Sequence, residues 1–96
     1  MEPQESPNLA KHGVSFEEAS TVFYDPFAIT NDDLEHSEDE DRSRTIGVSA
    51  RLRMLVVVHL RPVNDLMRII SARKASRQEA QDYEQEVKDR LARDEQ

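Results

Sequence analysis

The chain has 96 residues, with 13 basic and 20 acidic side chains, 36% apolar residues and no cysteine. This length allows one small domain, and the lack of cysteine excludes a disulfide scaffold and a cysteine-ligated zinc or iron–sulfur site. The longest fully apolar run is Met54 to Val58, and no apolar stretch preceded by basic residues opens the chain. We therefore expect neither a membrane span nor a secretory signal. The expected location of the protein is the cytoplasm.

The formal charge of −7 is unevenly distributed along the chain. Residues 1–43 sum to −10, residues 44–77 to +7 and residues 78–96 to −4. A basic block between two acidic ones is a hint of a face that binds polyanions, whereas net charge alone bears on solubility. The alternative is that the basic block pairs with its acidic flanks.

The first elements predicted in chain order are two short helices. Residues 1–7 are polar with two prolines and predict an irregular lead-in. Residues 11–13 are typical of the end of a helical turn, where Gly13 takes the left-handed conformation that terminates a helix. Ser15 and Glu18 form a capping box, and apolar residues follow at helical spacing. This pattern predicts a helix over about 16–23 that ends near Asp25-Pro26.

The centre of the chain predicts a sheet. Residues 27–30 form a short strand candidate, residues 31–41 an acidic loop, and three further strand-length segments lie at about 44–49, 54–60 and 66–73. The segment 54–60 is apolar on both faces, which is typical of an interior strand of a covered sheet. The interruptions between the last three segments are short enough for hairpins, so we expect adjacent strands to pair antiparallel.

The last predicted element is a long helix. Ser76 and Glu79 form a second capping box, and an apolar stripe follows at helical spacing: Ala80, Tyr83, Val87 and Leu91. The helix should run from about 77 to beyond 90, with residues 92–96 as a frayed, charged tail. The fold class is therefore α+β: a small antiparallel sheet of three to four strands, two short N-terminal helices and one longer C-terminal helix, with the helices on one side.

Four stretches together resemble one protein family. They are NLAKHGVSFEEA at residues 8–19, HSEDEDR at 36–42, IGVSARLRMLVVVH at 46–59 and RIISARKASRQEAQDYE at 68–84. In this order and spacing they resemble the BrnT-type toxins of bacterial type II toxin–antitoxin systems. The resemblance implies a small ribonuclease with a RelE-like fold that inhibits translation. It further implies a BrnA-type antitoxin with a ribbon-helix-helix domain, through which the pair would repress its own promoter.

The chain departs from that family at its beginning. Family members usually start with an aromatic-rich strand resembling F-x-W-D-P, followed by a lysine-bearing helix start, and residues 1–7 contain neither feature. We therefore expect the first family strand to be missing or altered, and one toxin-like domain over residues 8–91. A lost strand would expose an edge of a marginally stable sheet.

The ribonuclease activity that the resemblance implies requires proton-transfer groups and cationic side chains. RNA cleavage needs a base for the ribose 2′-hydroxyl, an acid for the leaving 5′-oxygen and positive charge around the phosphorus, and we expect neither a metal nor a cofactor. The catalytic candidates are Arg68, Arg73, His59, His36 and Lys11, with His12, Glu79 and Tyr83 as further proton-transfer candidates. The substrate-binding candidates are Lys74, Arg77, Arg44 and Arg61, with Arg42 as another outer phosphate contact.

Each of these candidates has a structural alternative. His59 shares a strand face with Leu55 and Val57 and can be a buried core histidine. His36 lies in the acidic loop, where neighbouring carboxylates would raise its pKa, and the alternative is a solvated or capping role. Lys11 and His12 lie at a helix C-terminus, where the helix dipole stabilises cations.

The segment 66–73 is predicted to place Arg68 on one face with Leu66, Ile70 and Ala72, and Arg73 on the other with Met67, Ile69 and Ser71. An arginine between apolar strand residues needs an acid, the sheet rim or a phosphate as its partner. The family resemblance puts both arginines first among the functional candidates. The alternative is an internal ion pair with Glu17, Glu18 or Glu79.

Other activities fit less well. The acidic loop lacks the alternation and glycine of a calcium-binding loop and favours a solvated role. A non-catalytic toxin homologue that still binds the antitoxin and assists promoter repression is the main alternative, because of the altered beginning. A DNA-binding regulator acting alone is disfavoured, since the last helix has more acids than bases.

Overall fold

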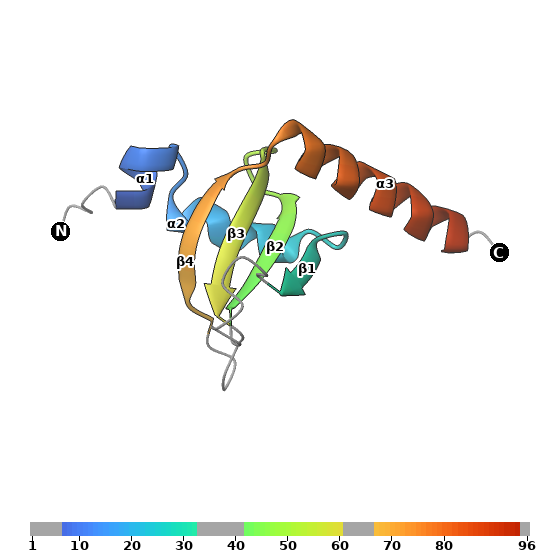
Figure 1. Cartoon of the computed structure of the whole chain (residues 1–96), viewed down its shortest axis with the longest axis horizontal. Helices are drawn as coiled ribbons and strands as arrows, with labels where there is room; N and C mark the ends of the chain where they lie inside the picture. The colour runs from blue at the N-terminus through green and yellow to red at the C-terminus, as the bar shows by residue number, and fades with distance from the viewer. Residues whose placement is uncertain (1–6, 33–41, 61–66, 95–96) are drawn as a thin grey trace.

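The computed structural model describes residues 7–32, 42–60 and 67–94. Two short helices, α1 (Pro7–His12) and α2 (Phe16–Thr21), lead into a 3-10 turn, η1 (Val22–Tyr24). Four strands follow, β1 (Ile29–Asp32), β2 (Arg42–Val48), β3 (Met54–Leu60) and β4 (Ile69–Lys74), and the long helix α3 (Arg77–Asp94) comes last (Figure 1). The predicted lead-in lies almost entirely outside the described residues.

The strands form one antiparallel sheet in the order β1-β2-β3-β4. This confirms the predicted α+β class, and the bounds of β3 match the apolar segment 54–60. The other strands begin or end two to three residues away from the expected positions, and α3 continues to Asp94 through residues assigned to the tail. No helix of the described part of the chain is long and apolar enough to cross a membrane.

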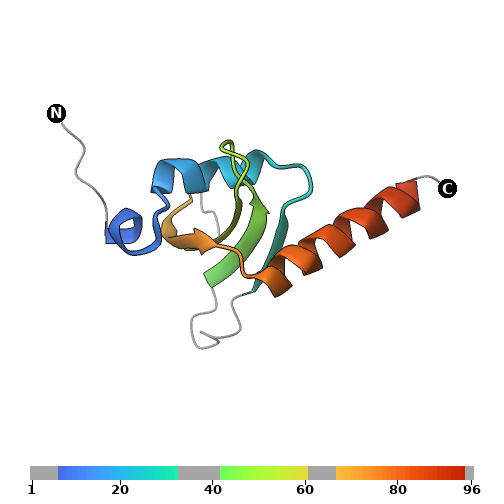
Figure 2. The ribbon, with the colours of Figure 1, turned by 90° about the horizontal axis from the view of Figure 1, so that it is seen from above.

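Helices cover both faces of the sheet, so the prediction that they lie on one side was wrong (Figure 2). One core lies between the sheet and the N-terminal helices and contains Val14, Ala19, Val22, Leu55, Val57 and Ala72. A second core lies under α3 and contains Ile46, Val56 and Tyr83. The physical reason is the apolar character of β3, whose Leu55 and Val56 are each 0% exposed. Both faces of that strand need cover.

The N-terminal helices form where the sequence predicts them. Gly13 has φ 73° and its N–H bonds the Leu9 carbonyl at 2.8 Å, which ends α1 in the left-handed conformation. Ser15 caps α2 by accepting from the Glu18 N–H at 3.0 Å. The reciprocal hydrogen bond of the predicted capping box, from the Ser15 N–H to the Glu18 side chain, is not among the contacts of Glu18. The Glu18 side chain is directed to Arg53 and Ser49 instead.

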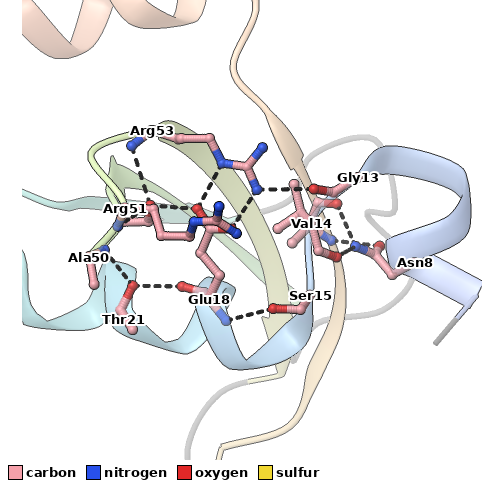
Figure 3. Close-up of polar contacts among 11 residues, drawn as sticks. Asn8, Gly13, Val14, Ser15, Glu18, Thr21, Ala50, Arg51 and Arg53 are labelled. Carbon is pink, nitrogen blue, oxygen red and sulfur yellow. Dashed lines mark hydrogen bonds and ion pairs between the residues drawn. The ribbon is translucent and has the colours of Figure 1, made fainter. Parts of the chain in front are cut away.

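The Glu18 carboxylate joins α2 to the β2–β3 turn (Figure 3). It is 5% exposed, accepts from Arg53 Nε at 2.9 Å and from Ser49 Oγ at 2.7 Å, and makes a further short contact with Arg53 Nη2. Arg53 Nη2 also donates to the Gly13 carbonyl at 3.0 Å. The hydrogen bonds from Arg53 lower the pKa of Glu18, although burial opposes them. One buried carboxylate thus fixes the turn against both N-terminal helices.

Asn8 connects α1 to the edge of the sheet. Its amide oxygen accepts from the Ala72 N–H at 3.0 Å, and its amide nitrogen donates to the Ala72 carbonyl at 2.8 Å and to the Val14 carbonyl at 2.7 Å. The residue is 8% exposed. Its side chain therefore satisfies the outward-facing peptide groups of a β4 residue.

The β2–β3 turn contains a strained residue. Leu52 has φ 64°, and its N–H bonds the Ser49 carbonyl at 2.8 Å. A non-glycine residue in this region costs roughly 1–3 kcal/mol. Leu52 is also 84% exposed, so burial of its side chain does not offset that cost.

Candidate functional site

Two arginines of the basic block meet one carboxylate on the α3 side of the sheet. Arg73 pairs across the sheet with Val56, which belongs to the core under α3, and Arg44 lies two residues before Ile46 of the same core. Arg73 Nη1 and Nη2 donate to Glu79 Oε1 and Oε2 at 2.7 and 2.8 Å, and Arg44 Nη1 is 3.8 Å from Glu79 Oε2. The structure therefore brings together two predicted cations from β2 and β4.

Glu79 also completes the predicted capping box of α3. The Ser76 N–H donates to Glu79 Oε1 at 2.8 Å, and the Glu79 N–H donates to Ser76 Oγ at 3.1 Å. The Arg73 guanidinium and the Ser76 N–H lower the pKa of Glu79 from 4.5 to about 2, against the effect of burial. Glu79 is thus a carboxylate at neutral pH and holds the arginines, which makes it a poor proton donor.

This arrangement gives a pH-dependent stability. The pKa of Glu79 is lower in the folded chain, so its stabilisation is complete above about pH 4.5 and is lost as the pH falls towards 2. Glu79→Gln should lower the free energy of unfolding by on the order of 1–2 kcal/mol at pH 7 after allowance for solvent screening. The difference between wild type and variant, measured in urea, should shrink between pH 4.5 and 3.

The matched control is Glu84→Gln, at an exposed position of the same helix. It should leave the free energy of unfolding within about 0.5 kcal/mol of wild type over this pH range. A difference between wild type and Glu79→Gln that stays constant from pH 7 to pH 3 would contradict the assignment.

A hollow of about 480 Å³ lies where β3 ends and β4 begins. Its lining combines apolar side chains with two arginines: Phe16, Arg42, Leu60, Arg68, Ile69 and Ile70. Arg42 opens β2 and pairs with Leu60 across the sheet, whereas Phe16 comes from the first turn of α2. The hollow is therefore built from three strands or their ends and one helix.

A bulge in β4 shapes this hollow. Val58 pairs with Ser71 but His59 pairs with Ile69, which leaves Ile70 as an extra residue on β4. Ile69 consequently packs against the core of Ala72, and not on the side of Ser71 as predicted. The prediction assumed unbroken alternation and was wrong here. Because side chains alternate along a strand, Arg68 lies on the opposite face of the sheet from Ile69 and therefore on the same face as Arg73, not on the opposite face as predicted.

Arg68 and Arg73 differ in their surroundings. Arg73 makes the two-pronged ion pair with Glu79, which was one of the predicted alternatives. Glu18, another acid considered for these arginines, is bound to Arg53. Arg68 is exposed, and its guanidinium has no hydrogen bond or ion pair within residues 7–32, 42–60 and 67–94. Of the two leading candidates, Arg68 is the one with a guanidinium open to a ligand.

His59 is buried inside the fold. It is 3% exposed, its Nε2 is 2.8 Å from Thr45 Oγ1 and its Nδ1 is 3.1 Å from the Leu60 carbonyl. Thr45 Oγ1 is also 2.7 Å from Thr30 Oγ1, and the Phe23 ring meets the imidazole edge to face at 5.0 Å. Both ring nitrogens are thus occupied by neighbours within the chain.

The remaining candidates are scattered. Lys11 is exposed in α1, Lys74 is the exposed last residue of β4, and Arg77 is the exposed first residue of α3. None of the three lines the hollow of Arg42 and Arg68. His36 and Arg61 lie outside the described residues.

Two further proton-transfer candidates have other surroundings. His12 is half-buried at the end of α1. The Tyr83 hydroxyl donates to Asp25 Oδ2 at 2.5 Å, and burial together with this contact raises the pKa of Tyr83 well above its usual 10. No group of three His, Asp or Glu side chains that could hold a metal occurs in the part of the chain that the structure describes.

The apolar floor of the hollow was not predicted as part of a site. Phe16 and Leu60 were interpreted as a helix stripe and a strand end, and nothing local in the sequence indicates that they flank Arg68. The usable signal was the capping box at Ser15, which fixes where α2 begins and hence the position of Phe16.

Comparison with known protein families gives a match over most of the chain. A family model described as "Ribonuclease toxin, BrnT, of type II toxin-antitoxin system" matches residues 2–79. The matched region contains α1, α2, the whole sheet and the first turn of α3. No curated protein matches the chain.

Proposed function

The chain belongs to the BrnT family of ribonuclease toxins of type II toxin–antitoxin systems, and from this membership we propose that it is a metal-independent endoribonuclease that inhibits translation in the cytoplasm. Its partner is an antitoxin of the BrnA type with a ribbon-helix-helix domain. Promoter DNA is contacted only through that antitoxin. The fold is of the RelE-like kind.

The observation that carries this proposal is the hollow at the ends of β3 and β4. Its apolar floor, with Phe16 and Leu60, suits an unstacked base, since single-stranded RNA is commonly bound by stacking on aromatic and apolar side chains. Arg42 and the exposed Arg68 line the same hollow and supply donors to a phosphate. A base and its adjacent phosphate are therefore recognised by one site.

The Arg44–Arg73–Glu79 cluster supports the same reading. It carries two positive charges against one negative charge, so its net charge remains positive. Arg44 and Arg73 are 32% and 41% exposed, which leaves part of each guanidinium accessible to RNA. We assign to this pair the binding of a neighbouring phosphate and to Lys74 and Arg77 the outer contacts.

In this site, positive charge around the scissile phosphorus promotes RNA cleavage. A base removes the proton of the 2′-hydroxyl, the 2′-oxygen attacks the adjacent phosphorus, and the 5′-oxygen leaves with a proton from an acid. Arg68 stabilises the added negative charge of the transition state, and Arg73 binds the neighbouring phosphate. Lys11 does not line the hollow, so His36 is the proposed proton-transfer group. We give His59, with both nitrogens bonded internally, a positioning role instead.

The test is RNA cleavage by the purified chain in the presence of a chelator. We expect wild type to cleave a single-stranded RNA and Arg68→Ala to lose roughly 100-fold in rate, as for removal of one transition-state stabiliser. Arg93→Ala is the matched control, because Arg93 is a 65% exposed arginine at the far end of α3 and should not affect cleavage. Both variants should unfold at the wild-type midpoint.

The same variants can be tested in cells. Induced wild type should arrest growth and a co-expressed antitoxin should relieve the arrest, whereas Arg68→Ala should be harmless. Soluble wild-type protein that neither cleaves RNA nor arrests growth would reject the enzyme and favour a non-catalytic, antitoxin-binding homologue. Equal loss in Arg68→Ala and Arg93→Ala would reject the hollow as the site.

A further inference from the structure

The end of the sheet opposite the arginine hollow exposes two large apolar side chains. Tyr24, at the end of η1, is 86% exposed, and Leu52, in the β2–β3 turn, is 84% exposed, against 47% for Leu91 and 38% for Met67. A second hollow of about 380 Å³ lies at this end of the sheet and is lined by Thr21, Tyr24, Asp25, Val48, Ser49 and Ala50. The Ala50 N–H bonds Thr21 Oγ1 at 2.8 Å, so the turn and α2 form one continuous surface.

Leu52 is exposed at a position where a leucine is unfavourable for the isolated chain. Its φ of 64° is one that glycine adopts without strain. The side chain belongs to neither of the two cores. A contact with a second molecule would bury this side chain and offset the cost of its backbone conformation.

Hydrogen bonds and an ion pair hold the turn next to these residues in place. Glu18 holds Arg53 and Ser49, and Ser49 Oγ accepts from the backbone N–H groups of Arg51 and Arg53 at 3.2 and 3.3 Å (Figure 3). The turn is thus fixed to α2 by an ion pair whose carboxylate is buried. A preformed surface of this kind loses little conformational entropy when a partner binds.

The rim of this surface carries a positive charge at Arg51, whereas the hollow contains the Asp25 carboxylate, which is bonded to Phe27, Val48 and Tyr83. Arg51 precedes Leu52, is exposed, and has no hydrogen bond or ion pair of its guanidinium among the described residues, although it is near enough to help lower the pKa of Glu18. Arg53 is neutralised by Glu18. A partner that matches this surface must combine an apolar side chain with a carboxylate.

We propose that this surface, made of Tyr24, Leu52, the 380 Å³ hollow and Arg51, is where the antitoxin docks. The inference rests on the proposed function for the existence of that partner. An amphipathic antitoxin segment places an apolar side chain in the hollow, packs against Tyr24 and Leu52, and directs a carboxylate at Arg51. Arg42 and Val48 are the two ends of β2, about 20 Å apart at strand spacing, so the residues of this contact are separate from those of the arginine hollow.

The experiment measures affinity for the purified antitoxin encoded beside this chain's gene, by titration calorimetry with the full chain. Leu52→Gly removes the side chain and suits the backbone conformation, so it should weaken binding about tenfold with an unchanged or higher unfolding midpoint. Tyr24→Ser combined with Leu52→Gly should weaken it at least 100-fold. Arg51→Glu should weaken binding where Arg51→Lys does not, and Leu91→Ser, at another exposed apolar position, is the control.

The outcomes separate this surface from the ribonuclease proposal. Cleavage of RNA is measured without antitoxin, and the Tyr24 and Leu52 variants should retain it. Arg68→Ala should lose cleavage and keep wild-type affinity for the antitoxin. Wild-type affinity in the double variant, or no binding of that antitoxin by wild type, overturns the docking surface even if RNA cleavage is established. If wild type binds the antitoxin and the Tyr24 and Leu52 variants do not, the docking surface is supported even when wild type fails to cleave RNA.

Discussion

Glu18→Ala should lower the free energy of unfolding by about 2–4 kcal/mol, because two donors lose a buried charged acceptor while Arg53, at 29% exposure, stays partly hydrated. The Glu18 carboxylate is 5% exposed and is the acceptor for both Arg53 and Ser49. Without it, the Arg53 guanidinium stays beside the Gly13 carbonyl with no counter-charge. Since a small domain is stable by only about 5–15 kcal/mol, this one change removes a substantial fraction of its stability.

The measurement is urea unfolding of wild type, Glu18→Ala and Glu17→Ala at pH 7. Glu17 is the exposed neighbour in the same turn of α2, and its replacement should change the free energy by less than about 0.5 kcal/mol. The pKa of Glu18 is lowered in the folded chain, so the stabilisation is present above about pH 4.5 and is lost as the pH falls further. Equal stability of the Glu17 and Glu18 variants would show that the ion pair contributes nothing.

Asp25→Ala should cost about 2–4 kcal/mol, because one carboxylate serves three buried or half-buried donors. Asp25 Oδ1 accepts from the Phe27 N–H at 2.9 Å, and Oδ2 accepts from the Val48 N–H at 2.9 Å and the Tyr83 hydroxyl at 2.5 Å. Burial opposes the ionisation of Asp25, but these three hydrogen bonds outweigh it and lower its pKa below 3.8. The residue thereby connects the segment before β1, β2 and α3.

Tyr83→Phe should cost less, about 1 kcal/mol, because it removes one of the three hydrogen bonds and keeps the ring in the core. Urea unfolding followed by far-UV circular dichroism compares both variants with wild type. Asp94→Ala, at the exposed end of α3, is the control. If Asp25→Ala cost no more than Tyr83→Phe, the hydrogen bonds to Phe27 and Val48 would be of no energetic consequence.

Local patterns in the sequence predicted much of the fold. The apolar run at 54–60 and the capping boxes at Ser15 and Ser76 each depend on residues within a few positions of one another, and each element begins where its pattern indicates. The bulge at Ile70 and the second helical face could not be predicted in this way. They depend on how β4 meets β3 and on which face of the sheet α3 crosses, and both involve contacts between distant segments.

In the candidate site, too, contacts between residues close in sequence could be predicted, whereas contacts between distant segments could not. The Arg73–Glu79 ion pair joins residues six positions apart and was one of the alternatives considered. The Arg53–Glu18 pair spans 35 positions and was missed. The hollow of Arg68 was missed as a unit as well, because Phe16 reaches it from α2 only after the chain has folded around the sheet.

The pairing of Asn8 with Ala72 has a consequence for self-association. Edge strands invite pairing with the strands of other molecules, and native proteins protect such edges by covering them. Here a single side-chain amide imitates a neighbouring peptide and occupies both groups of Ala72. Another chain can pair with β4 at Ala72 only by first displacing Asn8. The six-residue helix α1 thus protects this part of the sheet edge from pairing with another molecule, and the protection depends on the side chain of Asn8.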